Sequence, residues 1–365
     1  MKLHTIANKL RAAQILIKHK GLPSFLKKRV FGCVCREARF GMSYIAMRCM
    51  ESCFAAANKH KYTLPNYLQL EPTSRCNMKC RNCTRDILGV SGDMDFNDFI
   101  KVIRQFLFLK EVKLQGLGEP LLNASIFKMA EYLKKKSITT YIASNATLIT
   151  EEKACDMIKY FDKIEISLDA FGRDKIKEIR GVDCLDSILK GIRLLSSANN
   201  SNADIAVNFV MEKANVEDLV PLIGLISDLG VYNINIVNLQ NWVSVDSKYA
   251  DKRQKLSERN LVLDGENAEH LKKAILLAKT KAVHVDFVLP EEQRGKCFWY
   301  KKGVYVSWNG YVTPCCIRPN YEEFNFGNIF NNNIRQIWNS PAYVEFRQKL
   351  NSGNAPLVCK GCNYA

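Results

Sequence analysis

Arg75-Cys76-Asn77-Met78-Lys79-Cys80-Arg81-Asn82-Cys83 is the most informative stretch of this chain, because it places three cysteines on one short loop. The loop directly follows a predicted strand at 67–71, and thiols at positions i, i+4 and i+7 can converge on one metal cluster. A structural zinc ion needs four closed ligands, and no histidine or fourth cysteine lies near in the sequence. A [4Fe–4S] cluster held by three cysteines keeps one iron open for an external ligand. The spacing therefore favours an iron–sulfur cluster at a catalytic site.

The chain after residue 67 alternates between predicted strands and predicted helices. Strands are expected at 67–71, 112–114, 139–143, 163–168, 204–211 and 233–237, and helices at 96–109, 125–135, 151–161, 185–197 and 216–229. A further helix at 268–279 and a strand near 283–289 follow. About six β/α units of this kind indicate a parallel sheet or an incomplete β/α barrel, since a full barrel needs eight.

Composition and charge divide the chain into a basic arm and a nearly neutral body. Hydrophobic residues make up 47% and charged residues 25% of the 365 residues, which excludes extensive disorder. The net charge is +16, and residues 1–61 contain 13 Lys and Arg against only Glu37 and Glu51. Fourteen cysteines in a long chain without a secretory signal favour metal binding over disulfides. We expect a cytoplasmic protein.

The arm, residues 1–63, is predicted to be helical. Ile6, Leu10, Ala13 and Ile17 recur at helical spacing, with basic residues between them. A basic amphipathic helix can pack on the body as a solvated cap, or lie on an anionic membrane surface or a partner. Nucleic acid is an unlikely partner, because the arm has few aromatic residues for stacking. No apolar run in the chain is long enough to span a membrane. Peripheral membrane contact through the arm is therefore the only membrane association that we expect.

Four further motifs follow the predicted strands in order. They are Gln115-Gly116-Leu117-Gly118-Glu119-Pro120, Ser144-Asn145-Ala146, Ser167-Leu168-Asp169 and Arg180-Gly181. Behind the Cys-x3-Cys-x2-Cys loop, this series resembles the radical S-adenosylmethionine (radical SAM) superfamily. The resemblance implies an α/β fold, a partial (β/α)6 TIM-like barrel with an N-terminal helical arm and a small C-terminal cysteine-rich cluster module. It also implies domains at 1–63, 64–290 and 291–365.

The resemblance assigns each motif a role at the cofactor. Cys76, Cys80 and Cys83 would bind a [4Fe–4S] cluster whose open iron holds S-adenosylmethionine. The cofactor-binding residues that it implies are Gln115, Gly116, Gly118 and Glu119 at the methionine ammonium, Asn145 near the ribose, and Ser167, Asp169 and Arg180, of which Ser167 and Arg180 would face the methionine carboxylate. Two positions depart from the family pattern, since Asn82 stands where an aromatic residue is usual and Leu117 interrupts the glycine pair.

A second cysteine set lies near the C-terminus, at Cys297, Cys315, Cys316, Cys359 and Cys362. A hairpin is expected at 304–312, because Asn309-Gly310 is a strong turn signal. This layout resembles the SPASM and twitch auxiliary-cluster modules, which implies one auxiliary [4Fe–4S] cluster on Cys297, Cys315, Cys359 and Cys362. Neighbouring side chains on an extended chain point to opposite faces, so Cys316 would be the spare thiol, although either Cys315 or Cys316 could be the ligand. Four thiolates would also satisfy zinc.

The resemblance implies a radical SAM enzyme of the oxidoreductase type. It would cleave S-adenosylmethionine reductively to a 5′-deoxyadenosyl radical and abstract a hydrogen from its substrate. We expect a net oxidation or modification of a small-molecule, sugar or lipid-linked substrate, with the auxiliary cluster transferring electrons. An external flavodoxin or ferredoxin would supply the reducing electron. Two alternatives stay open, a maturase of a ribosomal peptide or protein cofactor and a non-enzymatic iron–sulfur carrier or regulator. The sequence does not identify a general base.

Overall fold

The computed structural model describes residues 64–199, 203–287, 292, 295 and 297–364. The chain divides into two compact units, residues 1–64 and residues 65–365. The predictions for the arm, including membrane contact, lie outside the described residues. Among the helices that are described, none is both long enough and apolar enough to cross a membrane.

A nine-stranded sheet forms the centre of the second unit, in the order β7-β6-β5-β4-β3-β2-β1-β8-β9. The strands are β1 (Tyr67–Leu70), β2 (Glu111–Leu114), β3 (Thr139–Ser144), β4 (Lys163–Ser167), β5 (Asp204–Met211), β6 (Asn233–Asn238), β7 (His284–Asp286), β8 (Gly303–Val306) and β9 (Val312–Thr313). Strands β1 to β6 pair in parallel in chain order, and β7 continues the parallel sheet beside β6. The α/β prediction with a partial (β/α)6 barrel is therefore confirmed.

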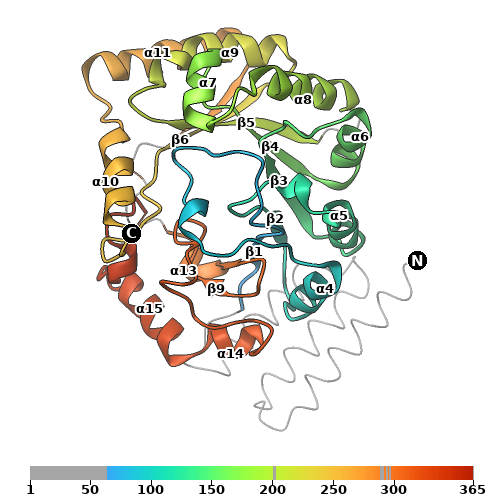
Figure 1. The fold of residues 1–365 in the computed structure, drawn as a ribbon, viewed down its shortest axis with the longest axis vertical. Helices are drawn as coiled ribbons and strands as arrows, with labels where there is room; N and C mark the ends of the chain where they lie inside the picture. The colour runs from blue at the N-terminus through green and yellow to red at the C-terminus, as the bar shows by residue number, and fades with distance from the viewer. Residues whose placement is uncertain (1–63, 200–202, 288–291, 293–294, 296, 365) are drawn as a thin grey trace, which may run out of the picture. The chain divides into compact units, whose positions relative to one another are not determined.

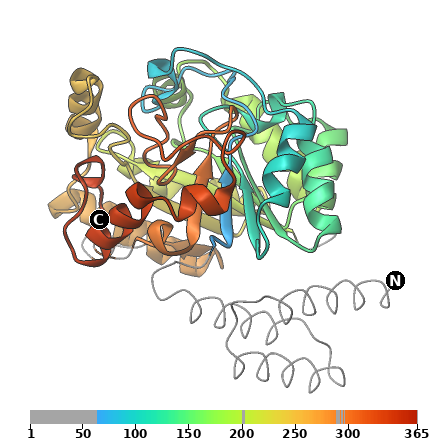
Figure 2. The same cartoon turned by 90° about the horizontal axis from the view of Figure 1, so that it is seen from below.

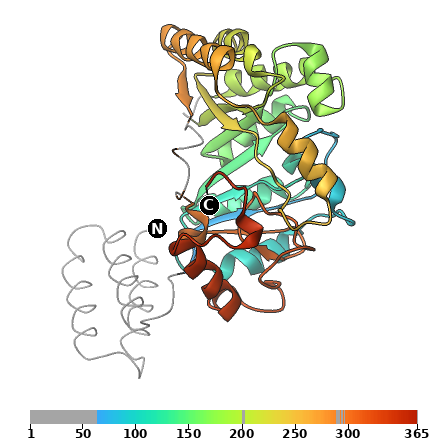
Figure 3. The same cartoon turned by 90° about the vertical axis from the view of Figure 1, so that its left-hand side faces the viewer.

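Most helices cover the outer face of this curved sheet (Figure 1). They are α4 (Phe96–Arg104), α5 (Ile126–Lys135), α6 (Glu151–Tyr160), α7 (Arg173–Arg180), α8 (Leu185–Ala198), α9 (Leu219–Asp228), α10 (Ala250–Arg259), α11 (Gly265–Thr280), α13 (Trp299–Lys302), α14 (Ile334–Trp338) and α15 (Pro341–Asn351), with short 3-10 turns at Arg85–Ile87, Pro120–Leu122, Val216–Asp218 and Leu357–Cys359. Figure 3 shows α9 and α11 at one end of the sheet and the C-terminal helices at the other.

The strands separate the apolar core from a polar interior. Successive side chains on a strand alternate between its two faces. On β1 and β2 the fully buried residues are apolar, Leu68, Leu70, Val112 and Leu114. Lys113, which lies between two of them, lines a cavity on the concave side instead. The helices thus cover an aliphatic layer, and hydrogen-bonding side chains face the inside of the barrel.

Several elements differ from the sequence prediction in extent or existence. Helix α4 ends at Arg104 instead of reaching residue 109, because the backbone N–H of Lys110 donates to the carbonyl of Asn66 and begins the pairing of β2. Helices α7 and α10 were not predicted. Leu256 is the only buried residue of α10, so its sequence carries almost no apolar periodicity.

The C-terminal segment completes the sheet on its other side. Strand β8 pairs in parallel with β1, and β9 returns antiparallel to β8, so the predicted hairpin is present. Gly310 in its turn has φ 87°, a conformation that favours glycine. Figure 2 shows this orange hairpin beside the blue strand β1. The cysteine-bearing C-terminal segment is therefore joined to the barrel by backbone hydrogen bonds.

We expect Leu68→Ala to destabilise the protein by about 2–5 kcal/mol, because Leu68 is fully buried on a central strand and its loss leaves a cavity. Leu276→Ala removes the same atoms from a side chain that is 65% exposed, and is expected to change stability by less than about 0.5 kcal/mol. Urea unfolding of both variants measures the difference. Equal losses would contradict the assignment of Leu68 to the core.

Candidate functional site

A cavity of about 690 Å³ opens at the carboxyl ends of the barrel strands. This edge is where parallel β/α folds place their functional residues. All eleven barrel residues that the sequence singled out line this one cavity: Cys76, Cys80, Cys83, Gln115, Gly116, Gly118, Glu119, Asn145, Ser167, Asp169 and Arg180. Residues that are up to about one hundred positions apart in the sequence are thus brought to a single site.

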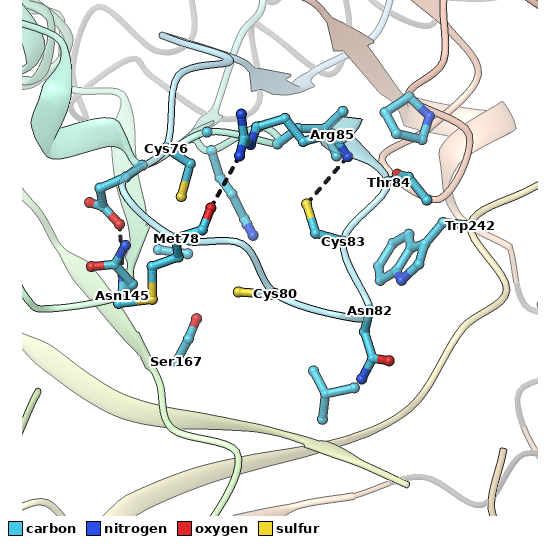
Figure 4. Close-up of a pocket in the computed structure, with 18 of the residues that line it drawn as sticks. Cys76, Met78, Cys80, Asn82, Cys83, Thr84, Arg85, Asn145, Ser167 and Trp242 are labelled. Atoms are coloured by element: carbon cyan, nitrogen blue, oxygen red, sulfur yellow. Dashed lines mark hydrogen bonds between the residues drawn. The ribbon is translucent and has the colours of Figure 1, made fainter. Parts of the chain in front are cut away.

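The three loop cysteines point their sulfur atoms into this cavity (Figure 4). The backbone N–H of Arg85 donates to Sγ of Cys83 at 3.4 Å, and the Arg85 guanidinium donates to the carbonyl of Met78 at 3.1 Å. Burial raises the pKa of Cys76, and it raises the pKa of Cys83 to about 11. Among the described residues, no three His, Cys, Asp or Glu side chains are close enough to bind a single metal ion. Positive charge from bound iron would be needed to hold these thiols as thiolates.

The cysteine loop is anchored by its backbone to the end of helix α7. The N–H of Lys79 donates to the carbonyl of Arg180 at 3.2 Å, and the N–H of Arg81 donates to the carbonyl of Ile179 at 2.9 Å. Gly181 ends the helix with φ 75°, and a Cβ there would lie 2.5 Å from the Lys79 carbonyl oxygen. The Arg180-Gly181 motif thus has a structural role, since only glycine allows this close approach.

Asn82 makes a contact that an aromatic residue could not make. The guanidinium of Arg259, at the end of α10, donates to Oδ1 of Asn82 at 3.1 Å and to the carbonyl of Arg81 at 3.2 Å. The Arg81 side chain in turn pairs with the buried Glu212 at 2.6 Å. The departure from the family pattern at position 82 is therefore matched by a second residue, far away in the sequence.

Arg180 is the buried cation of the site. Its guanidinium pairs with the Asp169 carboxylate at 2.5 Å, and its Nη1 lies 3.9 Å from Sγ of Cys80. Burial alone would lower the pKa of Arg180, but Asp169 and Cys80 outweigh burial and raise it. The backbone N–H of Val210 also donates to Asp169 at 2.9 Å. Arg180 is thus held charged and next to the cluster loop.

Glu119 is buried, and its carboxylate accepts hydrogen bonds from the chain itself. The donors are Ser144 Oγ at 2.8 Å, the N–H of Asn145 at 2.8 Å and the N–H of Leu121 at 3.1 Å. Burial raises the pKa of Glu119, and these three donors oppose the rise. Glu119 thus ties the turn after β2 to the end of β3. Its role at a ligand ammonium stays a prediction.

The turn before Glu119 packs directly against the cysteine loop. A Cβ on Gly118 would lie 2.3 Å from the carbonyl oxygen of Thr73 and 2.5 Å from that of Arg75. The end of β3 contacts the same loop, because the Asn145 side chain donates to Oδ1 of Asn77 at 2.9 Å. The predicted motifs therefore form one packed layer around the loop.

Glu71 belongs to the site, although the sequence analysis did not single it out. Its carboxylate accepts from the N–H of Leu117 at 2.8 Å and from the N–H of Trp308 at 3.2 Å. A Cβ on Gly116 would lie 2.2 Å from Cγ of Glu71. Burial raises the pKa of Glu71 to about 7. This side chain joins the turn after β2 to the C-terminal hairpin, through a hydrogen bond between residues more than two hundred positions apart in the sequence.

The C-terminal cysteines form a second group beside β8. Cys315 is buried with Trp299, Tyr305 and Ile317, and Cys297, Cys316 and Cys362 pack against that cluster. Burial raises the pKa of Cys315 well above its usual value, and the nearby thiols of Cys316, Cys359, Cys297 and Cys362 raise it further. Cys316 also lines the barrel cavity. The five thiols are therefore neighbours, with Cys316 on the cavity side.

Two family models match the chain. The model described as the radical SAM superfamily matches residues 70–226, and the SPASM model, described as an iron–sulfur cluster-binding domain, matches residues 297–363. Among curated proteins, the tungsten-containing aldehyde ferredoxin oxidoreductase cofactor-modifying protein of Pyrococcus furiosus is 27% identical over 313 residues, 77% of this chain and 83% of that protein. A probable GTP 3′,8-cyclase of Saccharolobus solfataricus is 31% identical over 179 residues, 47% of this chain and 56% of the cyclase.

Solved structures share the fold at low sequence identity. Streptococcus suis SuiB bound to S-adenosylmethionine aligns with a TM-score of 0.65 and 18% identity, covering 89% of this chain and 79% of SuiB. Native anSMEcpe with bound AdoMet aligns with a TM-score of 0.59 and 18% identity, covering 81% of this chain and 88% of that one. These likenesses concern the fold alone.

We expect Gly181→Ala to lower the iron content of the loop, because the new methyl group would displace the Lys79 carbonyl and the left-handed conformation costs alanine about 1–2 kcal/mol. Gly172→Ala, at the other end of α7, is the matched control, since a Cβ there meets nothing within 4 Å. Iron per chain after anaerobic reconstitution is the measurement. Full iron loading of Gly181→Ala would refute the anchoring role of α7.

We expect Glu71→Gln to remove a pH dependence from the stability of the apoprotein. Folded Glu71 keeps its proton up to a pKa of about 7, whereas the usual pKa of a glutamate side chain is 4.5. Between these two pKa values the folded state binds more protons than the unfolded state, so the stability of the wild type falls as pH rises. The wild type should lose about 1–3 kcal/mol relative to Glu71→Gln between about pH 5 and pH 8.

Urea unfolding at the two pH values measures this difference. Glu152→Gln, an exposed carboxylate on α6, serves as the control and should leave the wild-type profile unchanged. Parallel profiles for the wild type and Glu71→Gln would show that burial does not hold the proton on Glu71.

Proposed function

Because the chain belongs to the radical SAM superfamily and carries a C-terminal SPASM domain, we propose that it uses a 5′-deoxyadenosyl radical to remove a hydrogen atom from a polar substrate in the barrel cavity. The observation that carries this proposal is the convergence of the three loop cysteines and the four following motifs on that cavity. The radical SAM domain implies a [4Fe–4S] cluster and S-adenosylmethionine, and the SPASM domain implies an auxiliary iron–sulfur cluster.

The residues around the loop fit this pair of cofactors. Cys76, Cys80 and Cys83 would hold the cluster, which supplies the electron that cleaves S-adenosylmethionine. Three cysteines on one loop match a cluster that needs one open iron. The charged Arg180 and the hydroxyl of Ser167 would orient the methionine carboxylate, since a guanidinium fork suits a carboxylate. Backbone carbonyls of the turn at 115–118, supported by Glu119, would receive the ammonium, and Asn145 would lie near the ribose.

The interior of the barrel supports a polar substrate. Lys113 on β2 pairs with Glu165 on β4 at 2.6 Å, and Asn208 on β5 donates to the same carboxylate oxygen at 2.6 Å. Asn235 on β6 donates to Oδ1 of Asn208 at 2.7 Å. This chain of hydrogen bonds crosses four strands and reaches the cavity at Lys113. A substrate that carries hydroxyl or carboxylate groups can bind there without leaving buried polar groups unpaired.

The C-terminal thiols support a net oxidation. Cys297, Cys315, Cys359 and Cys362 would hold one auxiliary [4Fe–4S] cluster, and complete cysteine ligation leaves no iron open for substrate. Such a cluster can take an electron from the substrate radical, which makes the overall reaction oxidative. Its place beside β8, next to the cavity-lining Cys316, suits that transfer. The electron for the loop cluster would come from an external flavodoxin or ferredoxin.

A modifying role toward a protein cofactor or peptide is the second candidate. It is supported by the similarity to the cofactor-modifying protein of Pyrococcus furiosus, which extends over 77% of this chain. The two candidates differ in what they consume. Incubation of the protein with S-adenosylmethionine and fractionated cell extract would decide between them. If the substrate is a small molecule, a low-mass fraction should stimulate 5′-deoxyadenosine formation. If it is a peptide or protein cofactor, the fraction that contains peptides or cofactors should do so.

We expect Cys80→Ala to abolish cleavage of S-adenosylmethionine to 5′-deoxyadenosine and methionine by the dithionite-reduced protein, because the cluster loses one of three ligands. Cys155→Ala, which removes an exposed thiol on α6, should keep wild-type turnover. Chromatography of 5′-deoxyadenosine measures both. Turnover that survives in Cys80→Ala, or is absent from the wild type, would exclude this function and favour an electron carrier.

A further inference from the structure

Arg318 is a buried cation at the junction of the barrel and the C-terminal cysteines. Arg318 is only 5% exposed to solvent. The guanidinium donates to the carbonyl of Val358 at 2.5 Å and to that of Lys360 at 3.4 Å, the two residues that flank Cys359. It also donates to the carbonyl of Asn241, after β6, at 2.6 Å. Arg318 therefore holds the cysteine-bearing tail against the barrel.

Arg318 has hydrogen bonds but no anionic partner among the residues that the structure describes. In the described part of the chain, every hydrogen-bond acceptor of its guanidinium is a backbone carbonyl, and no carboxylate pairs with it. A buried charge without a counterion is costly. The other deeply buried arginine of the site, Arg180, has Asp169 as its counterion. The absence of such a partner at Arg318 needs an explanation.

The acidic groups that face Arg318 are thiols. The guanidinium donates to the carbonyls on both sides of Cys359, which places its charge beside that buried thiol. Other cations near the thiols are less suited to this role. Lys301, beside Cys297, is exposed, and Lys113, beside Cys316, is already paired with Glu165. Of these three cations, Arg318 is the one that is deeply buried and has no carboxylate partner among the described residues.

We propose that Arg318 is the buried countercharge of the auxiliary cluster and holds its midpoint potential above the value that four thiolates alone would give. The inference rests on the proposed four-cysteine cluster. A [4Fe–4S] cluster with four thiolates is anionic and becomes more so on reduction. A nearby cation stabilises the reduced form more than the oxidised form, and burial keeps solvent and salt from screening it. A raised potential would help the cluster accept an electron from a substrate radical.

The test is a redox titration of the auxiliary cluster in the full-length chain, followed by electron paramagnetic resonance. Cys76, Cys80 and Cys83 are replaced by alanine, so that only the auxiliary cluster contributes to the signal. Three further substitutions are made separately in this background. Arg318→Gln removes the charge and keeps amide donors, Arg318→Lys keeps the charge, and Lys360→Gln removes an exposed charge next to Cys359.

Arg318→Gln should shift the midpoint potential to a more negative value. At a fixed potential its ratio of reduced to oxidised cluster should fall about tenfold, which for a one-electron couple corresponds to about 59 mV. Arg318→Lys and Lys360→Gln should stay close to the unmodified background. Assembly of the cluster in Arg318→Lys but not in Arg318→Gln would also support the proposal, because the protein would then keep its cluster only when position 318 is positively charged.

Two results would overturn the inference while the proposed function stands. One is an unchanged midpoint potential in Arg318→Gln. The other is a shift in potential, or a loss of the cluster, that is equal in Arg318→Lys and Arg318→Gln, since Arg318 would then act only through its hydrogen bonds to the backbone. A different result would overturn the net-oxidation part of the proposed function, while cleavage of S-adenosylmethionine at the loop cysteines would stand. If the background protein binds zinc, or lacks the roughly four irons and sulfides of one cluster, the C-terminal thiols do not form the electron acceptor.

Discussion

The backbone hydrogen bonds between the cysteine loop and the end of α7 are the constraint on which the site depends. The turn after β2 and the end of β3 hold the start of the loop, at Arg75 and Asn77, but not the segment from Lys79 to Cys83. In that segment the donors of Lys79 and Arg81 bind the carbonyls of Arg180 and Ile179, and Gly181 lets the loop and the helix touch. The same contact places the Arg180 guanidinium beside Cys80. One small interface thus fixes both the predicted cluster cysteines and the cation that lies beside Cys80.

Sequence patterns predicted the parts of the fold that depend on local periodicity. The strand at 204–211 matches β5 residue for residue, because most of its residues are apolar and buried. Helix α10 escaped prediction because only Leu256 is buried, and its polar surface resembles a loop. Helix α7 has only two apolar residues, Ile176 and Ile179, and is followed by its Arg-Gly motif. Local sequence thus identified the motif, but the helix that carries it became visible only in three dimensions.

The residues that sequence reasoning missed are charged groups with distant partners. Glu71 accepts from Trp308, and Arg259 donates to Asn82, across separations that no local pattern encodes. The available signal was weak: a glutamate directly after an apolar strand, and an arginine at the end of a polar helix. By contrast, the eleven predicted barrel residues were found because their motifs follow the strands in the order of a known family, although Arg180 itself lies at the end of α7. In parallel folds a position after a strand brings residues to one edge.

The extension of the sheet from β1 to β8 gives the two cysteine groups a common frame. Strand β1 leads into the cluster loop, and its neighbour β8 leads through the hairpin to Cys315. Since adjacent strands are tied by backbone hydrogen bonds, the groups cannot drift apart as two domains on a linker could. Glu71 strengthens this frame at the strand ends, and Arg318 does so at the tail. Because the rate of electron transfer falls steeply with distance, a shared sheet that keeps the separation constant suits the proposed chemistry better than two independently moving modules.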